Sequence, residues 1–70
     1  MPEYRITFSY RNPTDGKTKV HCDYEITGCV EDAVAEAEKY YGDLPEYQFV
    51  AAHVWDGSRW VPADDIRVCN

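Results

Sequence analysis

The segment from Cys29 to Gly42 constrains the fold most strongly, because it is the one stretch with the period of an amphipathic helix. On a wheel of about 3.6 residues per turn, one face collects apolar side chains and the other collects charged ones. The apolar face consists of Val30, Ala33, Val34, Ala37, Tyr40 and Tyr41. Gly42, in the left-handed conformation, and Pro45 predict the end of the helix. Its start is open between Cys29 and Thr27 as the capping residue.

Two segments before this helix alternate between apolar and polar residues, which is typical of strands with one buried face. In residues 4–10 the apolar residues begin at Tyr4 and recur at every second position. In residues 18–26 the same pattern predicts a buried face made of Thr18, Val20, Cys22, Tyr24 and Ile26. Residues 12–16 contain a proline and an Asp-Gly pair, which predict a tight turn. The two strands should therefore form a hairpin.

Residues 47–55 follow the helix and are typical of a third strand that is apolar on both faces, which suits a central position in a sheet. Two phases remain open for this strand. The buried set is either Val50, Ala52 and Val54, or Phe49, Ala51, His53 and Trp55. The Asp-Gly pair at 56–57 predicts a hairpin into a short fourth strand at residues 59–61, which Pro62 ends. Residues 66–69 form an optional fifth strand at the edge.

These elements predict a single domain over residues 1–70 in the α+β class, with the order ββαββ and an optional last strand. The strand order 2-1-3-4 makes every neighbouring pair antiparallel, and one amphipathic helix packs on one face of the sheet in a two-layer arrangement. The second sheet face is left with apolar side chains. They form either an interface or a surface that sheet curvature and the C-terminal segment cover.

The balance of charges limits the partners that the chain can meet. Thirteen Asp and Glu against seven Lys and Arg give a net charge of −6, which disfavours direct binding to nucleic-acid phosphates. No apolar stretch approaches the ~20 residues of a membrane-spanning helix, and the first ten residues lack the pattern of a signal peptide. Three cysteines at no framework spacing favour a reducing compartment. We therefore expect a cytoplasmic protein without a membrane partner.

Residues that could carry chemistry are scattered along the chain. The soft metal ligands are His21, Cys22, Cys29, His53 and Cys69. Their spacing does not match the paired ligands of structural zinc sites. The sequence has neither a Gly-x-Ser-x-Gly nucleophile motif nor a glycine-rich phosphate loop. Cys29 stands at the helix start, a position that can activate a thiol, so a reactive cysteine is one open alternative. We otherwise expect no metal, no cofactor and no enzymatic activity.

Acidic side chains are the most suggestive surface feature. Four of them lie on the outer face of the predicted helix, namely Glu31, Asp32, Glu36 and Glu38. Such a face presents a negative field that speeds association with a basic groove, although the same charges also serve solubility. Aromatic anchors dominate the binding energy of many interfaces. The anchors that the sequence offers are Tyr47, Trp55 and Trp60, which complete a predicted partner-binding set of seven residues.

The chain as a whole resembles the small phage-encoded inhibitors that include anti-CRISPR proteins. The resemblance lies in its size, its acidity and the succession of Y-R-I-T-F-S-Y, a hairpin, C-V-E-D-A-V-A-E-A-E-K-Y-Y-G and W-D-G-S-R-W. It implies a non-enzymatic protein-binding module that blocks a nucleic-acid-binding host protein through acidic side chains. The alternative is a homo-oligomeric structural or accessory domain, such as a homodimer, that associates through the outer sheet face.

Overall fold

The structure, a computed structural model, describes residues 1–63 of the chain. It contains four strands and one helix in the predicted order. These elements are β1 (Glu3–Arg11), β2 (Thr18–Ile26), α1 (Val30–Tyr41), β3 (Gln48–Trp55) and β4 (Trp60–Pro62). The optional fifth strand at residues 66–69 lies outside the described residues.

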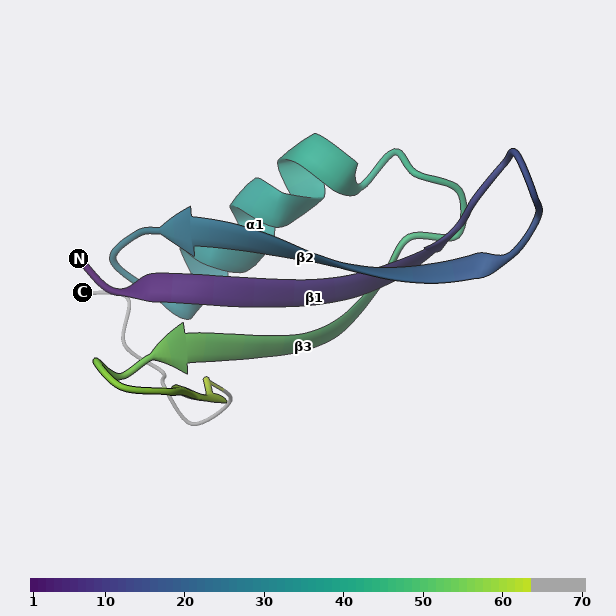
Figure 1. Cartoon of the computed structure of the whole chain (residues 1–70). Helices are drawn as coiled ribbons and strands as arrows, with labels where there is room; N and C mark the ends of the chain where they lie inside the picture. Colours follow the sequence, from purple (N-terminus) through teal and green to yellow (C-terminus); the bar gives the residue numbers. More distant parts are fainter. Residues whose placement is uncertain (64–70) are drawn as a thin grey trace.

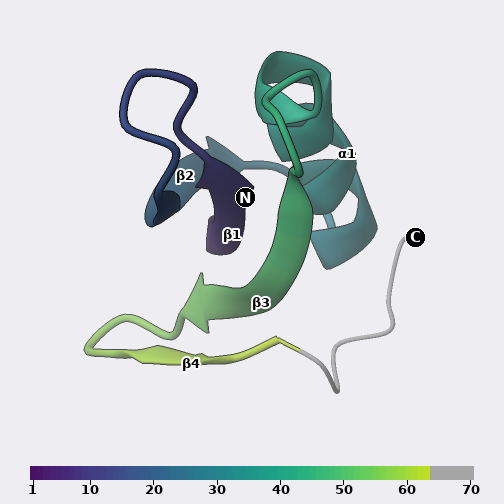
Figure 2. The same cartoon turned by 90° about the vertical axis from the view of Figure 1, so that its right-hand side faces the viewer.

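The four strands form one antiparallel sheet with the order β2-β1-β3-β4. This order confirms the predicted 2-1-3-4 arrangement. The helix α1 covers one face of the sheet, and β3 curves away from it toward β4 (Figures 1 and 2). The fold is therefore a small two-layer α+β domain with one open sheet face.

The core lies between β1, β3 and α1. Tyr4, Ile6 and Phe8 of β1 are 0 to 2% exposed, which confirms the predicted phase of the first strand. The residues that share a core cluster with Tyr4 and Ile6 are Ala33 and Ala37 of α1, Ala52 and Val54 of β3, and Ala63. Alanine side chains on the helix let its backbone approach the sheet closely, because they add little volume between the two layers.

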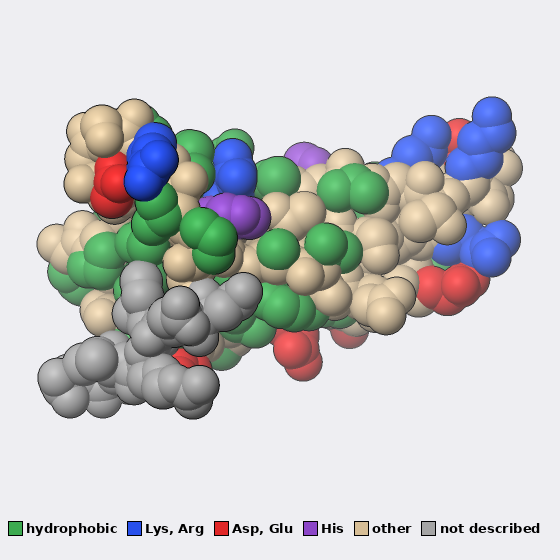
Figure 3. Space-filling model, turned by 90° about the horizontal axis from the view of Figure 1, so that it is seen from below, with side chains coloured by type: hydrophobic (Ala, Val, Ile, Leu, Met, Phe, Trp, Pro, Cys, Tyr) green, Lys and Arg blue, Asp and Glu red, His purple; other side chains and the backbone are tan. Residues whose placement is uncertain are grey.

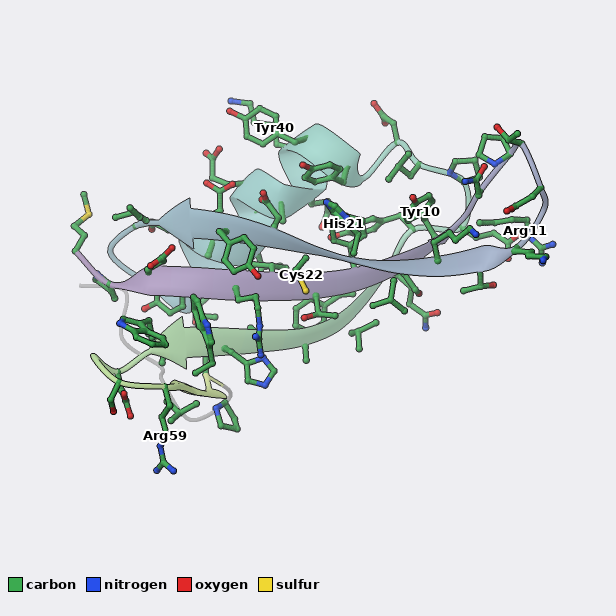
Figure 4. All side chains as sticks on the ribbon, viewed as in Figure 1. Tyr10, Arg11, His21, Cys22, Tyr40 and Arg59 are labelled. Carbon is green, nitrogen blue, oxygen red and sulfur yellow. The ribbon has the colours of Figure 1, made fainter. Side chains whose placement is uncertain are left out.

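Tyr40 does not belong to this core. Its side chain is 64% exposed and lies on the outer side of α1 (Figure 4). The prediction of a buried Tyr40 is therefore wrong. The stripe of α1 that packs on the sheet is narrow, because it follows Ala33 and Ala37. At the last turn Tyr41 takes the inward position, with its ring centroid 4.9 Å from that of Phe8.

Both ends of α1 lie where the sequence predicts, but the capping at each end differs from the prediction. Cys29 is the N-cap residue without a side-chain hydrogen bond, while the Thr27 hydroxyl accepts a hydrogen bond from the Cys29 N–H at 3.3 Å. Gly42 has φ −61° and is not left-handed, so that prediction is wrong. Its N–H donates to the Glu38 carbonyl at 2.7 Å, and a Cβ on Gly42 would collide with that carbonyl oxygen. Glycine is required there by close approach.

The second strand has the opposite phase to the one that its pattern predicts. In the β1–β2 ladder Ile6 faces Asp23 and Tyr4 faces Glu25. Residues opposite each other across a ladder share a face, so these two carboxylates lie on the helix side. The predicted apolar set of β2 lies on the open face with Arg5 of β1. The prediction is wrong because alternation shows that two faces differ, not which one meets the core.

The structure also settles the phase of β3. Ala52 and Val54 are buried opposite Ile6 and Tyr4 of β1. His53 and Trp55 therefore point to the open face. The register shifts between Thr7 and Phe8 of β1. Such a bulge adds a residue to one strand and bends it. The alternation is therefore interrupted in the first half of β3, where Phe49 and Val50 are 44% and 54% exposed.

Candidate binding surfaces

The predicted site residues lie on opposite sides of the sheet. One side carries what we call the acidic surface, formed by α1 and the helix-facing side of β2. It consists of Asp23, Glu25, Glu31, Asp32, Glu36 and Glu38. The other side is the open sheet face, which includes Glu3, Arg5, Arg11, Val20, Cys22, Tyr24, Ile26, His53, Trp55 and Trp60. The helix carboxylates and the two tryptophans therefore do not form one site.

On the acidic surface, Asp23 and Glu25 are two residues apart on the same side of β2, and Glu36 of α1 adds its charge. The pKa of Glu25 rises to about 7. The main cause is the hydrogen bond that protonated Glu25 shares with Asp23, followed by burial and by the charges of Asp23 and Glu36. The Oδ2 atom of Asp23 is shielded from solvent and has no hydrogen-bond partner. Above a pH of about 7 Glu25 loses its proton, and its charge then meets those of Asp23 and Glu36.

The ion pairs within residues 1–63 lie outside the group of Asp23, Glu25 and Glu36. Three ion pairs are present within this range, and they join Arg11 to Glu46, Lys19 to Asp15 at 3.0 Å and Arg59 to Asp56 at 3.6 Å. Lys39, the cation of the last helical turn, lies 5.8 Å from the ring centroid of Tyr40.

Glu25→Gln should change how stability depends on pH. Folded Glu25 keeps its proton up to a pH of about 7, whereas unfolded Glu25 loses it near the ordinary value of 4.5. Between these values the folded state binds more protons, so this residue makes the free energy of unfolding fall as pH rises. Between pH 5 and pH 7.5 the free energy of unfolding should fall by about 1 kcal/mol less in the variant than in wild type. This value allows for the solvent, which screens part of the repulsion. Urea unfolding at both pH values measures this.

The matched control for that experiment is Asp43→Asn, which neutralises an exposed carboxyl in the connection between α1 and β3. It should keep the wild-type dependence on pH. The same dependence in wild type and in Glu25→Gln would contradict the raised pKa of Glu25.

The open sheet face carries an aromatic cluster. The ring of Trp60 lies 5.4 Å from that of Trp55 and 5.7 Å from that of Tyr24, measured between centroids. The Cζ atom of Arg5 lies 5.1 Å from the centroid of the Trp60 ring, within the range of a cation–π interaction. The cluster thus joins β2, β1, β3 and β4 across the full width of the sheet.

A tight turn places the two tryptophans side by side. Trp55 and Trp60 are partners in the β3–β4 ladder. In the turn between them, a carboxylate oxygen of Asp56 accepts hydrogen bonds from the N–H groups of Ser58 and Arg59 at 2.8 and 2.9 Å, and Gly57 has φ +106°. These hydrogen bonds lower the pKa of Asp56. The predicted Asp-Gly hairpin is confirmed, with a loop of residues 56–59.

Much of the open sheet face is apolar and exposed. The side chains of Val20 and Ile26 are each 68% exposed, and those of Tyr24 and Trp55 are 54% and 41% exposed. Figure 3, a view from below, shows hydrophobic side chains along the molecule, with Lys and Arg at the right-hand end, where the turn between β1 and β2 lies, and also at the upper left. Contiguous exposed apolar patches are typical of interaction sites.

Tyr47, the third predicted anchor, belongs to neither surface. Its ring packs 5.1 Å from that of Phe8 on the helix side of the sheet. His21, which lies 5.5 Å from Phe8 and 5.7 Å from Tyr41, completes this cluster (Figure 4). Burial and the charges of Glu38 and Asp23 raise the pKa of Tyr47. Tyr47 therefore helps to close the core beside the acidic surface.

The cysteines and possible metal ligands give no further site. Cys29 is buried and disulfide-bonded, so the reactive thiol considered at this position is not present. Cys22 is a free cysteine on the open sheet face, with its sulfur 3.5 Å from the Thr7 hydroxyl. In residues 1–63, no three His, Cys, Asp or Glu side chains are placed to hold a metal ion. That part of the chain also contains no helix that is long and apolar enough to cross a membrane.

No protein-family model matches the sequence, and comparisons with curated proteins and with solved structures find no significant match. Functional conclusions therefore come from the two surfaces of the molecule itself.

Proposed function

We propose that this protein is a non-enzymatic protein-binding module whose acidic surface docks on a basic surface of a nucleic-acid-binding protein and blocks it. This is the mode of action implied by its resemblance to phage-encoded inhibitors of the anti-CRISPR type. The observation that carries the proposal is the group of Asp23, Glu25 and Glu36. Asp23 and Glu25 lie on the same side of β2, and the pKa of Glu25 is raised by its hydrogen bond with Asp23, by burial and by the charges of Asp23 and Glu36.

The electrostatics of this group favour a cationic partner. A carboxyl group such as that of Glu25, whose pKa is higher in the folded state, makes the folded protein less stable at neutral pH. Lysine or arginine side chains of a partner would stabilise the charged form of Glu25 and so offset this cost. The exposed helix carboxylates extend the same negative field along α1, which speeds the encounter with a basic groove. A groove that binds nucleic-acid phosphates has this chemistry.

A capture experiment tests the proposal. The tagged protein is incubated with nuclease-treated lysate of the organism in which it acts, washed at increasing salt and analysed by mass spectrometry. We expect one stoichiometric nucleic-acid-binding protein that moderate salt releases, because screening weakens exposed charge pairs. The captured protein should also lose its nucleic-acid binding when the module is present. A partner that still binds its nucleic acid normally would contradict the blocking function.

Charge reversal on the helix should weaken this complex. We expect the double variant Glu36→Lys, Glu38→Lys to bind the captured partner about 100-fold more weakly, because two attractive charges become repulsive. Its affinity should also depend less on salt. Isothermal titration calorimetry at two or more ionic strengths measures both effects.

The matched control reverses two carboxylates outside the acidic surface, Glu3→Lys with Asp43→Lys, and changes the net charge by the same amount. Within residues 1–63 neither residue takes part in an ion pair. The control should retain most of the affinity. Equal losses in the two double variants would mean that only net charge matters, and unchanged affinity in the helix variant would remove α1 from the interface.

A further inference from the structure

We propose that the open sheet face binds a second copy of this chain, which gives a back-to-back dimer with one acidic surface on each outer side. This inference concerns the side of the sheet that the proposed function does not use. Its occupant is identified by three properties of the face, namely its apolar character, its charge and its size.

The apolar side chains of this face are not needed by the core of the single chain. Val20, Tyr24 and Ile26 lie on β2, an edge strand, and point away from the helix. Each is more than half exposed, so each gains little from folding of the monomer. A second sheet packed over them would bury the apolar residues of both copies, as the inner faces of a β-sandwich do at a separation of about 10 Å.

The charge of the open sheet face suits a second copy. The chain has a net charge of −6, so two copies repel each other wherever their acidic surfaces approach. On the open face, the described strand residues with formal charge are Glu3, Arg5 and Arg11, and Arg11 is already paired with Glu46. Glu3 and Arg5 balance each other. A two-fold axis brings the same patch of both copies together, and this neutral patch can meet itself without repulsion.

Two polar atoms on the face lack hydrogen-bond partners in the described structure. They are Arg5 Nε and His53 Nδ1, both shielded from solvent, and their residues are neighbours in the β1–β3 ladder. Shielded polar atoms without partners are costly. A second copy can offer the Glu3 carboxylate of its own open face as an acceptor for Arg5.

The size of the face sets the strength of this contact. Its strands have nine, nine, eight and three residues, which at about 3.3 Å per residue and about 4.8 Å between strands cover roughly 460 Å² in projection. Specific interfaces begin at about 600 Å² per partner. Side-chain relief adds to the projected area, so a dimer of low affinity is expected.

The test is the mass of the purified full chain in solution. Sedimentation equilibrium between about 1 μM and about 1 mM should show the 8.1 kDa monomer converting to a dimer. Tyr24→Lys should weaken the dimer at least ~30-fold, because a central aromatic contact is replaced by a charge. Ile26→Lys should act in the same direction. Both variants should fold, since these exposed side chains contribute little to the core.

Tyr40→Lys is the matched control, because Tyr40 is also a tyrosine that is more than half exposed and lies on the opposite layer. It should leave the dimer unchanged. A wild-type mass of 8.1 kDa throughout the series would overturn the inference and leave the face to a foreign protein or to stacked nucleotides. A dimer that resists Tyr24→Lys and Ile26→Lys but dissociates with Tyr40→Lys would place the contact on the helix layer and overturn it as well.

Discussion

Phe8→Ala should remove a large share of the stability of this domain. The Phe8 side chain is fully buried and contacts Tyr41 of α1 and Tyr47 before β3, so it joins β1 to the end of the helix and to the segment before β3. Truncating a buried phenylalanine costs about 3 to 5 kcal/mol. A domain of this length has about 3.5 to 10 kcal/mol of stability in total. Circular dichroism with urea titration measures the loss.

Phe49→Ala provides the control for this prediction, because Phe49 is paired with Phe8 in the sheet but is 44% exposed. Its truncation should cost about 1 kcal/mol, since much of the ring is already in water. Equal destabilisation by the two variants would mean that the core is not centred on β1 as described.

Ala33→Leu should separate the helix from the sheet. Ala33 is fully buried where α1 crosses β1 and β3, and three additional carbon atoms have no space between the two layers. Overpacking of this kind costs about 1 to 3 kcal/mol. The effect should be seen as a lower midpoint of urea unfolding, and as altered chemical shifts of the Ile6 and Val54 methyl groups.

Ala35→Leu is the control within the same helix. Ala35 is exposed, and leucine and alanine both favour helices. The free energy of unfolding of this variant should therefore stay within about 0.5 kcal/mol of wild type. If Ala35→Leu destabilised the protein as much as Ala33→Leu, the helix would lie on the sheet through a different face.

The helix and the strand order were predictable from the sequence because each rests on a strong local pattern. The alanine stripe of α1 and the alternation from Tyr4 to Phe8 each show that the element is apolar on one face only. Antiparallel pairing then restricts the order of four strands joined by one helix. Tyr40 shows the limit of such patterns, because the width of a buried stripe depends on what the helix packs against.

The phase of β2 could not be predicted, because its apolar residues would serve a core and an interface equally well. Only the ladder with β1 decides it, through the pairing of Ile6 with Asp23. That same pairing creates the acidic group with Glu25 and Glu36, which the sequence pattern places on unrelated exposed faces. It also moves Tyr24 to the open face beside the tryptophans. Both surfaces therefore depend on a long-range register.

The central claim is that the acidic surface, and not the open sheet face, contacts the partner. Cross-saturation NMR on the isotope-labelled protein in complex with its captured partner tests this directly. We predict saturation transfer to the amide groups of α1, residues 30–41, with the indole N–H signals of Trp55 and Trp60 unaffected. Transfer to both indole groups without transfer to the helix would contradict the account.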